Sequence, residues 1–174
     1  LRPIAVVPVA VRRLRLRGIS GAGTADHRSV VKLPKAVPFD VAAVFSCAVI
    51  PGVGAVVNTA KVPMGASVGI VGLGGVGLSA MLGAKATGAR QIIGIDPVKY
   101  KREGAKQHGA DMVFDSDDSD VVEKIRDDTS SGQDYVFESV GEVLAIEVAY
   151  SDTVGGCVKS TIGLSNPAKM IVWR

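Results

Sequence analysis

Apolar and polar positions follow two different periods along this chain, and after residue 66 the two kinds of segment take turns. Short apolar runs rich in valine and isoleucine predict buried strands, and longer amphipathic runs that end at glycines predict helices. The predicted strands are 67–71, 91–95, 112–114, 134–138 and 155–163. The predicted helices run from 75 to just before Gly88, over 99–108, over about 121–128 and over about 142–151.

This alternation predicts the α/β fold class, with a doubly wound parallel sheet and helices on both faces. The expected strand order is 3-2-1-4-5, and a ligand crevice is expected at the carboxyl ends of the strands. Residues 27–174 are expected to form this domain. Its first part is predicted to hold a short strand at 28–32, a helix at 41–45 that Asp40 caps, and a helix at 51–60. One more short strand is expected at 169–173, and residues 1–26 are expected to be an irregular N-terminal arm.

A cluster of glycines lies between the first predicted strand and its helix. Gly72 allows a sharp turn, Gly74 leaves room for a pyrophosphate beside the backbone, and Gly77 lets the helix pack closely on the strand. The free N–H groups and positive end of that helix favour a phosphate. Within this strand, turn and helix the pattern predicts dinucleotide binding. A glycine-rich turn that binds nothing is the alternative.

Asp96 ends the second predicted strand, about 20 residues after the glycine cluster, where an acid accepts hydrogen bonds from an adenosine ribose. A 2′-phosphate about 4 Å from this carboxylate would meet a repulsion of about 4 kcal/mol at an effective dielectric constant of 20. The sequence therefore predicts NAD as the cofactor in preference to NADP.

Composition and charge limit the classes of partner that the sequence predicts. The net charge is +3 and the pI is about 9.0, but much of the excess lies in the run Arg12–Arg17, and no nucleic-acid-binding module accompanies it. We therefore expect a solvated arm and no nucleic-acid partner. No uninterrupted apolar run reaches the length of a membrane span, so no membrane partner is expected either. Cys47 and Cys157 form no CxxC motif, which indicates a reducing, cytoplasmic setting. Cys157 is expected to be a buried apolar residue of the last main strand.

Three segments together resemble a known family: 45–61, from Phe-Ser-Cys-Ala-Val-Ile-Pro-Gly to Asn-Thr-Ala-Lys; 72–79, Gly-Leu-Gly-Gly-Val-Gly-Leu-Ser; and 137–141, Phe-Glu-Ser-Val-Gly. They are similar to the coenzyme domain of zinc-dependent medium-chain alcohol dehydrogenases, over about residues 27–165. The resemblance implies an NAD-dependent oxidoreductase that moves a hydride between an alcohol and an aldehyde or ketone, in a self-associating protein. It also implies positions for the coenzyme. The pyrophosphate would lie on Gly72, Leu73, Gly74, Gly75, Val76 and Gly77, the adenosine ribose on Asp96 and Lys101, and the nicotinamide end near Val140, Ile162 and Gly163.

The same resemblance makes Cys47 one of three protein ligands of a catalytic zinc. In the family the other ligands come from a separate catalytic domain that precedes the coenzyme domain; no match to it is found here, and residues 1–26 are expected to be a remnant of the junction. His27 lies in no ligand motif and His108 ends a predicted helix, so we expect this chain alone not to hold the zinc. No catalytic residue is assigned. Glu138 is interpreted as a strand-end carboxylate that caps a neighbouring helix.

Two other functions remain open at this point. One is a non-catalytic module that binds NAD(H). The other is a methyltransferase that uses S-adenosylmethionine, which the helix after Gly77 and the 137–141 motif disfavour.

Overall fold

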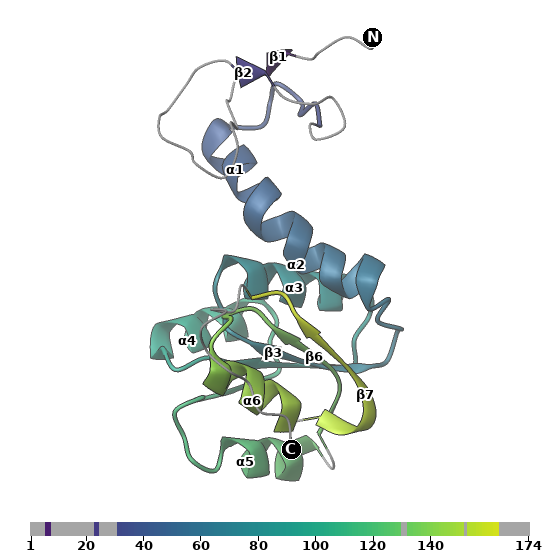
Figure 1. The fold of residues 1–174 in the computed structure, drawn as a ribbon, viewed down its shortest axis with the longest axis vertical. Coiled ribbons are helices and arrows are strands. Elements are labelled where there is room, and N and C mark those ends of the chain that lie inside the picture. Colours follow the sequence, from purple (N-terminus) through teal and green to yellow (C-terminus); the bar gives the residue numbers. More distant parts are fainter. Residues whose placement is uncertain (1–5, 8–22, 25–30, 130–131, 152, 164–174) are drawn as a thin grey trace. The chain divides into compact units, whose positions relative to one another are not determined.

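The computed structural model describes residues 6–7, 23–24, 31–129, 132–151 and 153–163 (Figure 1). The contacts between residues divide the chain into two units, Leu1–Ala42 and Ala43–Arg174. The strand predicted at 169–173 lies outside the described residues. Of the strand predicted at 28–32, only Val31 and Lys32 are described, and they are not in a strand.

The described part of the N-terminal arm contains paired backbone. Strand β1 (Val6–Val7) pairs antiparallel with β2 (Gly23–Thr24), so these residues are more regular than expected. The two strands form a sheet of their own and add no edge strand to the larger sheet.

A parallel five-stranded sheet forms the centre of the second unit. Its strands are β3 (Ser67–Val71), β4 (Gln91–Ile95), β5 (Met112–Phe114), β6 (Gln133–Glu138) and β7 (Thr153–Thr161). They lie in the order β5-β4-β3-β6-β7 and pair in parallel throughout. The predicted order 3-2-1-4-5 is therefore confirmed. After β3 the chain adds β4 and β5 on one side, and it then adds β6 and β7 on the other side. This change of side places a topological switch point at the carboxyl end of β3.

The helices that connect these strands follow the predicted segments closely. They are α3 (Gly75–Ala86), α4 (Lys99–His108), α5 (Val121–Thr129) and α6 (Val143–Ser151). Gly88, with a φ of 78°, and Gly109, with a φ of 117°, follow the ends of α3 and α4 in the left-handed region, as helix-terminating glycines do.

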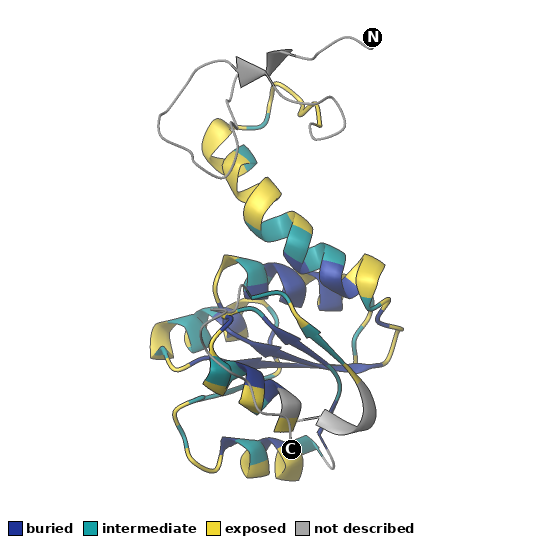
Figure 2. Ribbon diagram, in the orientation of Figure 1, coloured by how far each residue is buried: buried dark blue, intermediate teal, exposed yellow. Residues whose placement is uncertain are grey.

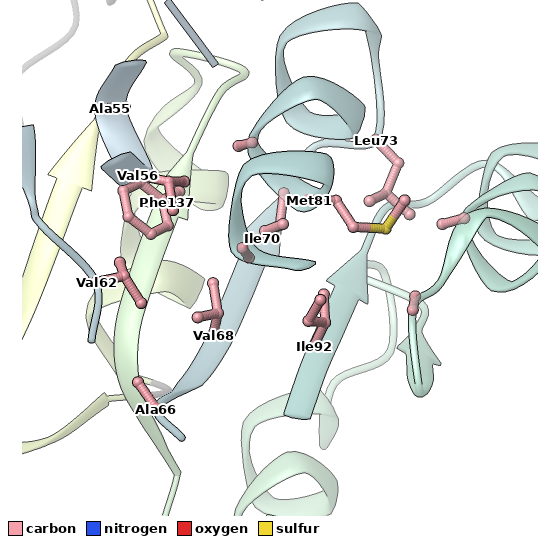
Figure 3. Packing of buried hydrophobic residues seen from close by; sticks show 14 residues of the cluster. Ala55, Val56, Val62, Ala66, Val68, Ile70, Leu73, Met81, Ile92 and Phe137 are labelled. Atoms are coloured by element: carbon pink, nitrogen blue, oxygen red, sulfur yellow. The ribbon is translucent and has the colours of Figure 1, made fainter. Parts of the chain in front are cut away.

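Two apolar layers lie on opposite faces of the sheet. Figure 2 shows that most residues of the central strands are buried. The first layer packs side chains of β3, β4 and β6 against α3, and Figure 3 shows Phe137 and Val68 within it. Phe137, at 0% exposure, is the largest fully buried side chain. The second layer joins Val71, Ile93 and Val136 to α5 and α6. The central strands β3, β4 and β6 contribute side chains to both layers, which explains why they appear in the sequence as continuous apolar runs.

A single long helix, Phe39–Thr59, precedes the sheet. It consists of α1 (Phe39–Val44), the π-helical turn η2 (Phe45–Val49), α2 (Ile50–Gly54) and a second π-helical turn, η3 (Ala55–Thr59). The prediction of two separate helices at 41–45 and 51–60 is therefore wrong, and Asp40 lies inside the first turn instead of capping it. By length and composition alone this helix could also cross a membrane, a test that the core helix of a soluble protein passes too. Polar residues and glycines interrupt its apolar positions, so it contains no uninterrupted apolar run of that length.

Close contact between α2 and α3 fixes this helix on the sheet. A Cβ placed on Gly52 would lie 2.4 Å from the carbonyl oxygen of Val76 and 2.7 Å from the Cβ of Ser79. Glycine at position 52 therefore sets how near the two helix backbones approach. Gly52 and Gly54, which the predicted helix at 51–60 already included, belong to the continuous helix Phe39–Thr59.

At the amino ends of the strands, Asp134 links β6 to β3. Its carboxylate accepts hydrogen bonds from the Ser67 backbone N–H and hydroxyl, both at 2.8 Å, and lies 3.5 Å from Arg90. The Ser67 N–H, aided by the hydroxyl and by Arg90, lowers the pKa of Asp134 below its ordinary value. This link lies at the end of the sheet opposite to the glycine turn.

Candidate functional site

The carboxyl end of β3 leads into a turn that only glycine accommodates. Gly72 has a φ of 91°, in the left-handed region, and its N–H donates to the carbonyl of Ile95 at 2.8 Å. A Cβ on Gly77 would lie 1.8 Å from the Gly72 carbonyl oxygen, so α3 starts in direct backbone contact with the turn. The roles expected of these two glycines agree with this geometry.

Gly74 differs from both, because a Cβ placed on it would meet no atom within 4 Å. It is the N-cap residue of α3, with extended backbone and no side chain to bond the first N–H groups of the helix. The start of this twelve-residue helix therefore presents free N–H groups and a positive dipole end to open space. This arrangement fits a phosphate group.

Leu73 stands between these glycines but contributes to the core. Its side chain is 1% exposed, and a Cβ on Gly94 of β4 would touch its methyl groups at 3.1 Å. Among the predicted phosphate-binding residues, Leu73 can therefore offer only its backbone to a ligand.

Asp96 lies at the end of β4 beside the same turn and is only 3% exposed. One carboxylate oxygen accepts a hydrogen bond from the Leu73 N–H at 2.8 Å, and the other accepts from the Val98 N–H at 2.9 Å. Lys101 places its ammonium group 3.7 Å from the first oxygen. Each carboxylate oxygen has a second acceptor direction, so ribose hydroxyls remain compatible with these bonds. The predicted ribose acid thus also ties the glycine turn to β4.

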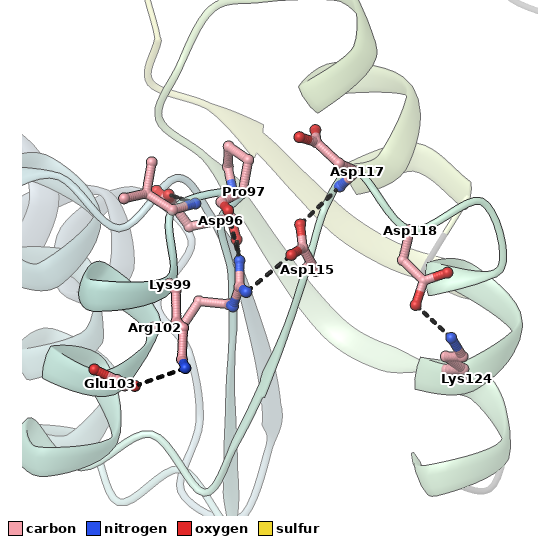
Figure 4. A network of polar contacts seen from close by, with 10 residues as sticks. Asp96, Pro97, Lys99, Arg102, Glu103, Asp115, Asp117, Asp118 and Lys124 are labelled. Atoms are coloured by element: carbon pink, nitrogen blue, oxygen red, sulfur yellow. Dashed lines mark hydrogen bonds and ion pairs between the residues drawn. The ribbon is translucent and has the colours of Figure 1, made fainter.

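Arg102, which was not among the residues predicted from the sequence, forms hydrogen bonds with the backbone directly after β4 (Figure 4). One guanidinium nitrogen donates to the carbonyls of Asp96 and Pro97, both at 2.7 Å, and the other lies 2.8 Å from the Asp115 carboxylate. The side chain of Arg102 is 16% exposed. The sequence shows only that Arg102 is a second cation directly after Lys101. Its contact with Asp115 arises because the fold brings the carboxyl end of β5 next to α4.

The ends of β6 and β7 meet on the other side of β3. The carbonyl of Glu138 accepts the N–H of Ile162 at 2.7 Å and that of Gly163 at 3.2 Å. A Cβ on Gly163 would lie 2.2 Å from the Gly141 nitrogen, and one on Gly72 would lie 2.5 Å from a methyl carbon of Val140. The structure therefore brings the predicted residues at 140, 162 and 163 to the same strand ends as the glycine turn.

The carboxylate of Glu138 serves the turn that follows its own strand. Its Oε1 atom accepts from the Val140 N–H at 2.5 Å and from the Gly141 N–H at 2.6 Å. Oε2 is buried and has no hydrogen-bond partner among the described residues. The interpretation of Glu138 as the cap of a neighbouring helix is wrong, because it accepts hydrogen bonds from the N–H groups of Val140 and Gly141, which precede α6.

A hollow of about 390 Å³ lies beside the end of β7. Its wall on one side is the helix at α2 and η3, and on the other side the last residues of β7. The lining residues are Ile50, Pro51, Gly54, Ala55, Asn58, Thr59, Ser160, Thr161 and Ile162. Of the predicted coenzyme contacts only Ile162 lines it, so the hollow adjoins the expected nicotinamide end and does not include the glycine turn.

Cys47 lies exposed in the π-helical turn η2. Pro51 lacks the N–H that an α-helix would direct to the carbonyl of Cys47, and the Ile50 N–H instead donates to the Phe45 carbonyl five residues earlier. The wide turn thus absorbs the proline without ending the helix.

The described residues do not complete a zinc site around Cys47. No group of three His, Cys, Asp or Glu side chains gathers among them in a way that could hold a metal. His27 and the side chain of Cys157 lie outside the residues whose side chains are described. His108 lies at the end of α4 with Nδ1 2.6 Å from the Gly104 carbonyl. A catalytic zinc needs three protein ligands, and the described residues around Cys47 do not supply them.

Comparison with known proteins places this geometry in context. The family model for zinc-binding dehydrogenases matches residues 75–170, which is more than half of the chain. The chain is 48% identical over 89 residues to alcohol dehydrogenase B of Mycobacterium tuberculosis (strain ATCC 25618 / H37Rv), a match that covers 51% of the chain and 24% of that relative. The chain therefore spans about a quarter of the length of the curated relatives it matches.

Solved structures give the same picture. The fold is similar to benzyl alcohol dehydrogenase from Acinetobacter calcoaceticus, with a TM-score of 0.78, 32% identity, and coverage of 83% of this chain and 40% of that one. It is also similar to an alcohol dehydrogenase zinc-binding domain protein from Burkholderia ambifaria, with a TM-score of 0.76, 30% identity, and coverage of 82% and 38%.

Proposed function

Because the chain belongs to the zinc-binding dehydrogenase family, we propose that it binds NAD(H) for an alcohol dehydrogenase-type oxidoreductase that interconverts an alcohol with an aldehyde or ketone. The observation that carries this proposal is the open space at Gly74. The free N–H groups at the start of α3 face that space, and the buried carboxylate of Asp96 lies one hydrogen bond away from the turn.

Each part of the site has a task in this proposal. The backbone N–H groups at Gly74 and Gly75 bind the pyrophosphate, aided by the dipole of α3. Asp96 accepts the adenosine ribose hydroxyls, and Lys101 keeps that carboxylate oriented through their ion pair. Val140 and the Ile162–Gly163 turn shield the nicotinamide end from water. Bound NAD⁺ supplies the acceptor for the hydride.

The preference for NAD over NADP rests on the same carboxylate. Asp96 is buried and fixed by two backbone N–H groups, so it cannot turn away from an added 2′-phosphate. At about 4 Å the repulsion amounts to about 4 kcal/mol at an effective dielectric constant of 20.

A non-catalytic NAD(H)-binding role is the second candidate, and the exposure of Cys47 favours it. This thiol has no two further metal-ligating side chains near it among the described residues. We propose that the 174-residue chain alone binds less than one zinc per chain and oxidises alcohols poorly. Elemental analysis after dialysis and NADH formation with a panel of primary and secondary alcohols test this. One zinc per chain, together with turnover that is lost in Cys47→Ser, would instead establish a working metalloenzyme.

We also propose self-association of the chain. β7 is the outermost strand of the described sheet on its side, and an unpaired strand edge is a template for another chain. Light scattering at increasing concentration should show a dimer or larger species, and a monomer at all concentrations would refute this.

A further inference from the structure

The peptide unit between Gly72 and Leu73 is hydrogen-bonded at both ends. Its N–H, on Leu73, donates to the Asp96 carboxylate at 2.8 Å. Its carbonyl, on Gly72, accepts a hydrogen bond from the Ser139 hydroxyl at 2.9 Å. The two partners come from the ends of β4 and β6, the strands that flank β3. One peptide plane in the glycine turn is therefore held from both neighbouring strands.

The hydroxyl of Ser139 is the group that makes the second of these bonds possible. The backbone N–H of Ser139 already donates to the carbonyl of Val71 at 2.9 Å, and the hydroxyl lies farther from that carbonyl, at 3.2 Å. Its single proton therefore goes to the nearer acceptor, Gly72. The Ser139 oxygen is also packed into the turn, because a Cβ on Gly77 would lie 3.0 Å from it.

This peptide plane needs to be held, since it sits at a residue with unusual freedom. Gly72 has a φ of 91° and no side chain, so its backbone can adopt conformations that other residues rarely reach. Rotation of this peptide plane would redirect the next N–H groups, at Gly74 and Gly75, away from the open space in front of α3. Ligand affinity falls in proportion to the fraction of molecules in which those groups point correctly.

We propose that Ser139 is a positioning residue for the pyrophosphate: its hydroxyl locks the Gly72–Leu73 peptide plane, and the lock aims the N–H groups of the glycine turn. This inference rests on the proposed NAD(H) binding. Ser139 touches the turn and not the ligand, so its effect is carried by the backbone.

Ser139→Ala removes the hydroxyl and keeps the Cβ. We expect the dissociation constant for NADH, measured by titration of the whole chain, to rise roughly tenfold, as loss of one buried hydrogen bond allows. Ser139→Thr retains a hydroxyl and should stay within about threefold of the parent. Amide exchange measured by NMR without ligand should accelerate at Leu73 in the alanine variant, because its peptide unit then keeps only the hydrogen bond to Asp96 and opens more often.

Ser79→Ala is the matched control. That hydroxyl donates to the carbonyl of Gly75 at 2.6 Å, inside α3 and close to the same turn, and the carbonyl keeps its helical N–H partner when the hydroxyl is removed. NADH affinity and exchange at Leu73 should not change in this variant. An unchanged dissociation constant in Ser139→Ala, or a weakened one with unchanged exchange at Leu73, would overturn the lock. If the parent protein does not bind NADH but exchange at Leu73 is still faster in Ser139→Ala than in the parent, the role of Ser139 in the turn is supported and the proposed function is refuted.

Discussion

Gly74→Val should remove coenzyme binding while the domain stays folded. A valine Cβ at this position meets no protein atom within 4 Å, and the backbone of Gly74, at φ −85° and ψ −168°, is extended and open to any residue. The added methyl groups would therefore occupy the space that the proposal assigns to the pyrophosphate, without displacing any described part of the fold.

The size of each effect follows from these contacts. Loss of two hydrogen bonds to a charged phosphate costs about 3–6 kcal/mol, which weakens NADH binding at least about a hundredfold. Folding loses only the preference for glycine over valine at an N-cap position, about 1 kcal/mol. A change of that size lowers the melting temperature of a chain of this length by about 2–4 °C.

NADH titration followed by calorimetry, together with thermal melting by circular dichroism, measures both quantities. Gly104→Ala is the matched control, because its Cβ also meets open space but lies on α4, away from the turn. It should bind NADH like the parent and melt slightly higher, since alanine favours a helix over glycine. Gly77→Ala should instead lose stability through the clash with Gly72. NADH affinity unchanged in Gly74→Val would refute the assignment of this space to the pyrophosphate.

Three further outcomes are expected. Asp96→Asn should narrow the preference for NADH over NADPH at least about tenfold, because it removes the charge that repels a 2′-phosphate; an unchanged ratio by titration of both coenzymes would argue against this role. Asp134→Asn should lower stability to urea at pH 7, because the Ser67 N–H holds the pKa of Asp134 below its ordinary 3.8. The stabilisation by this carboxylate is present above 3.8 and is lost as pH falls through the lower folded-state pKa, so the difference between variant and parent should shrink progressively below that value. Gly52→Ala should lower the free energy of unfolding by about 1–3 kcal/mol in the same assay, because its Cβ would meet the Val76 carbonyl at 2.4 Å; a variant as stable as the parent would show that α2 moves freely.

The strands and connecting helices could be predicted from the sequence because local signals agreed with the tertiary structure. The segments 67–71, 91–95 and 99–108 were predicted with the bounds that the structure shows, since each is an apolar run or an amphipathic run ended by a glycine. The strand order is the one expected of a doubly wound sheet of the dinucleotide-binding type.

The long helix could not be predicted, because its sequence carries breakers whose effect is cancelled by tertiary contacts. Pro51 falls where a π-helical turn absorbs the missing hydrogen bond. Gly52, which weakens an isolated helix, is required by the approach of α3. Local propensity and packing disagree at these residues, and packing prevails.

The sequence pattern selected residues that the structure brings to the same strand ends, but it did not reveal the bonds that link them. The pattern predicts a ribose-binding role for Asp96 and gives no sign that its carboxylate also accepts a hydrogen bond from the Leu73 N–H. Ser139 donates to the carbonyl of Gly72, and Arg102 donates to the carbonyl of Asp96. A backbone acceptor leaves no mark in the amino-acid sequence, and the partner of Ser139 becomes visible only when the ends of β3 and β6 are placed side by side.

The most direct test of the account is a calorimetric titration of the 174-residue chain with NADH, NADPH and S-adenosylmethionine under identical conditions. We predict saturable binding of NADH, at least about tenfold weaker binding of NADPH, as the charge of Asp96 requires, and no heat from S-adenosylmethionine. Equal or tighter binding of NADPH, or binding of S-adenosylmethionine without binding of NADH, would contradict it.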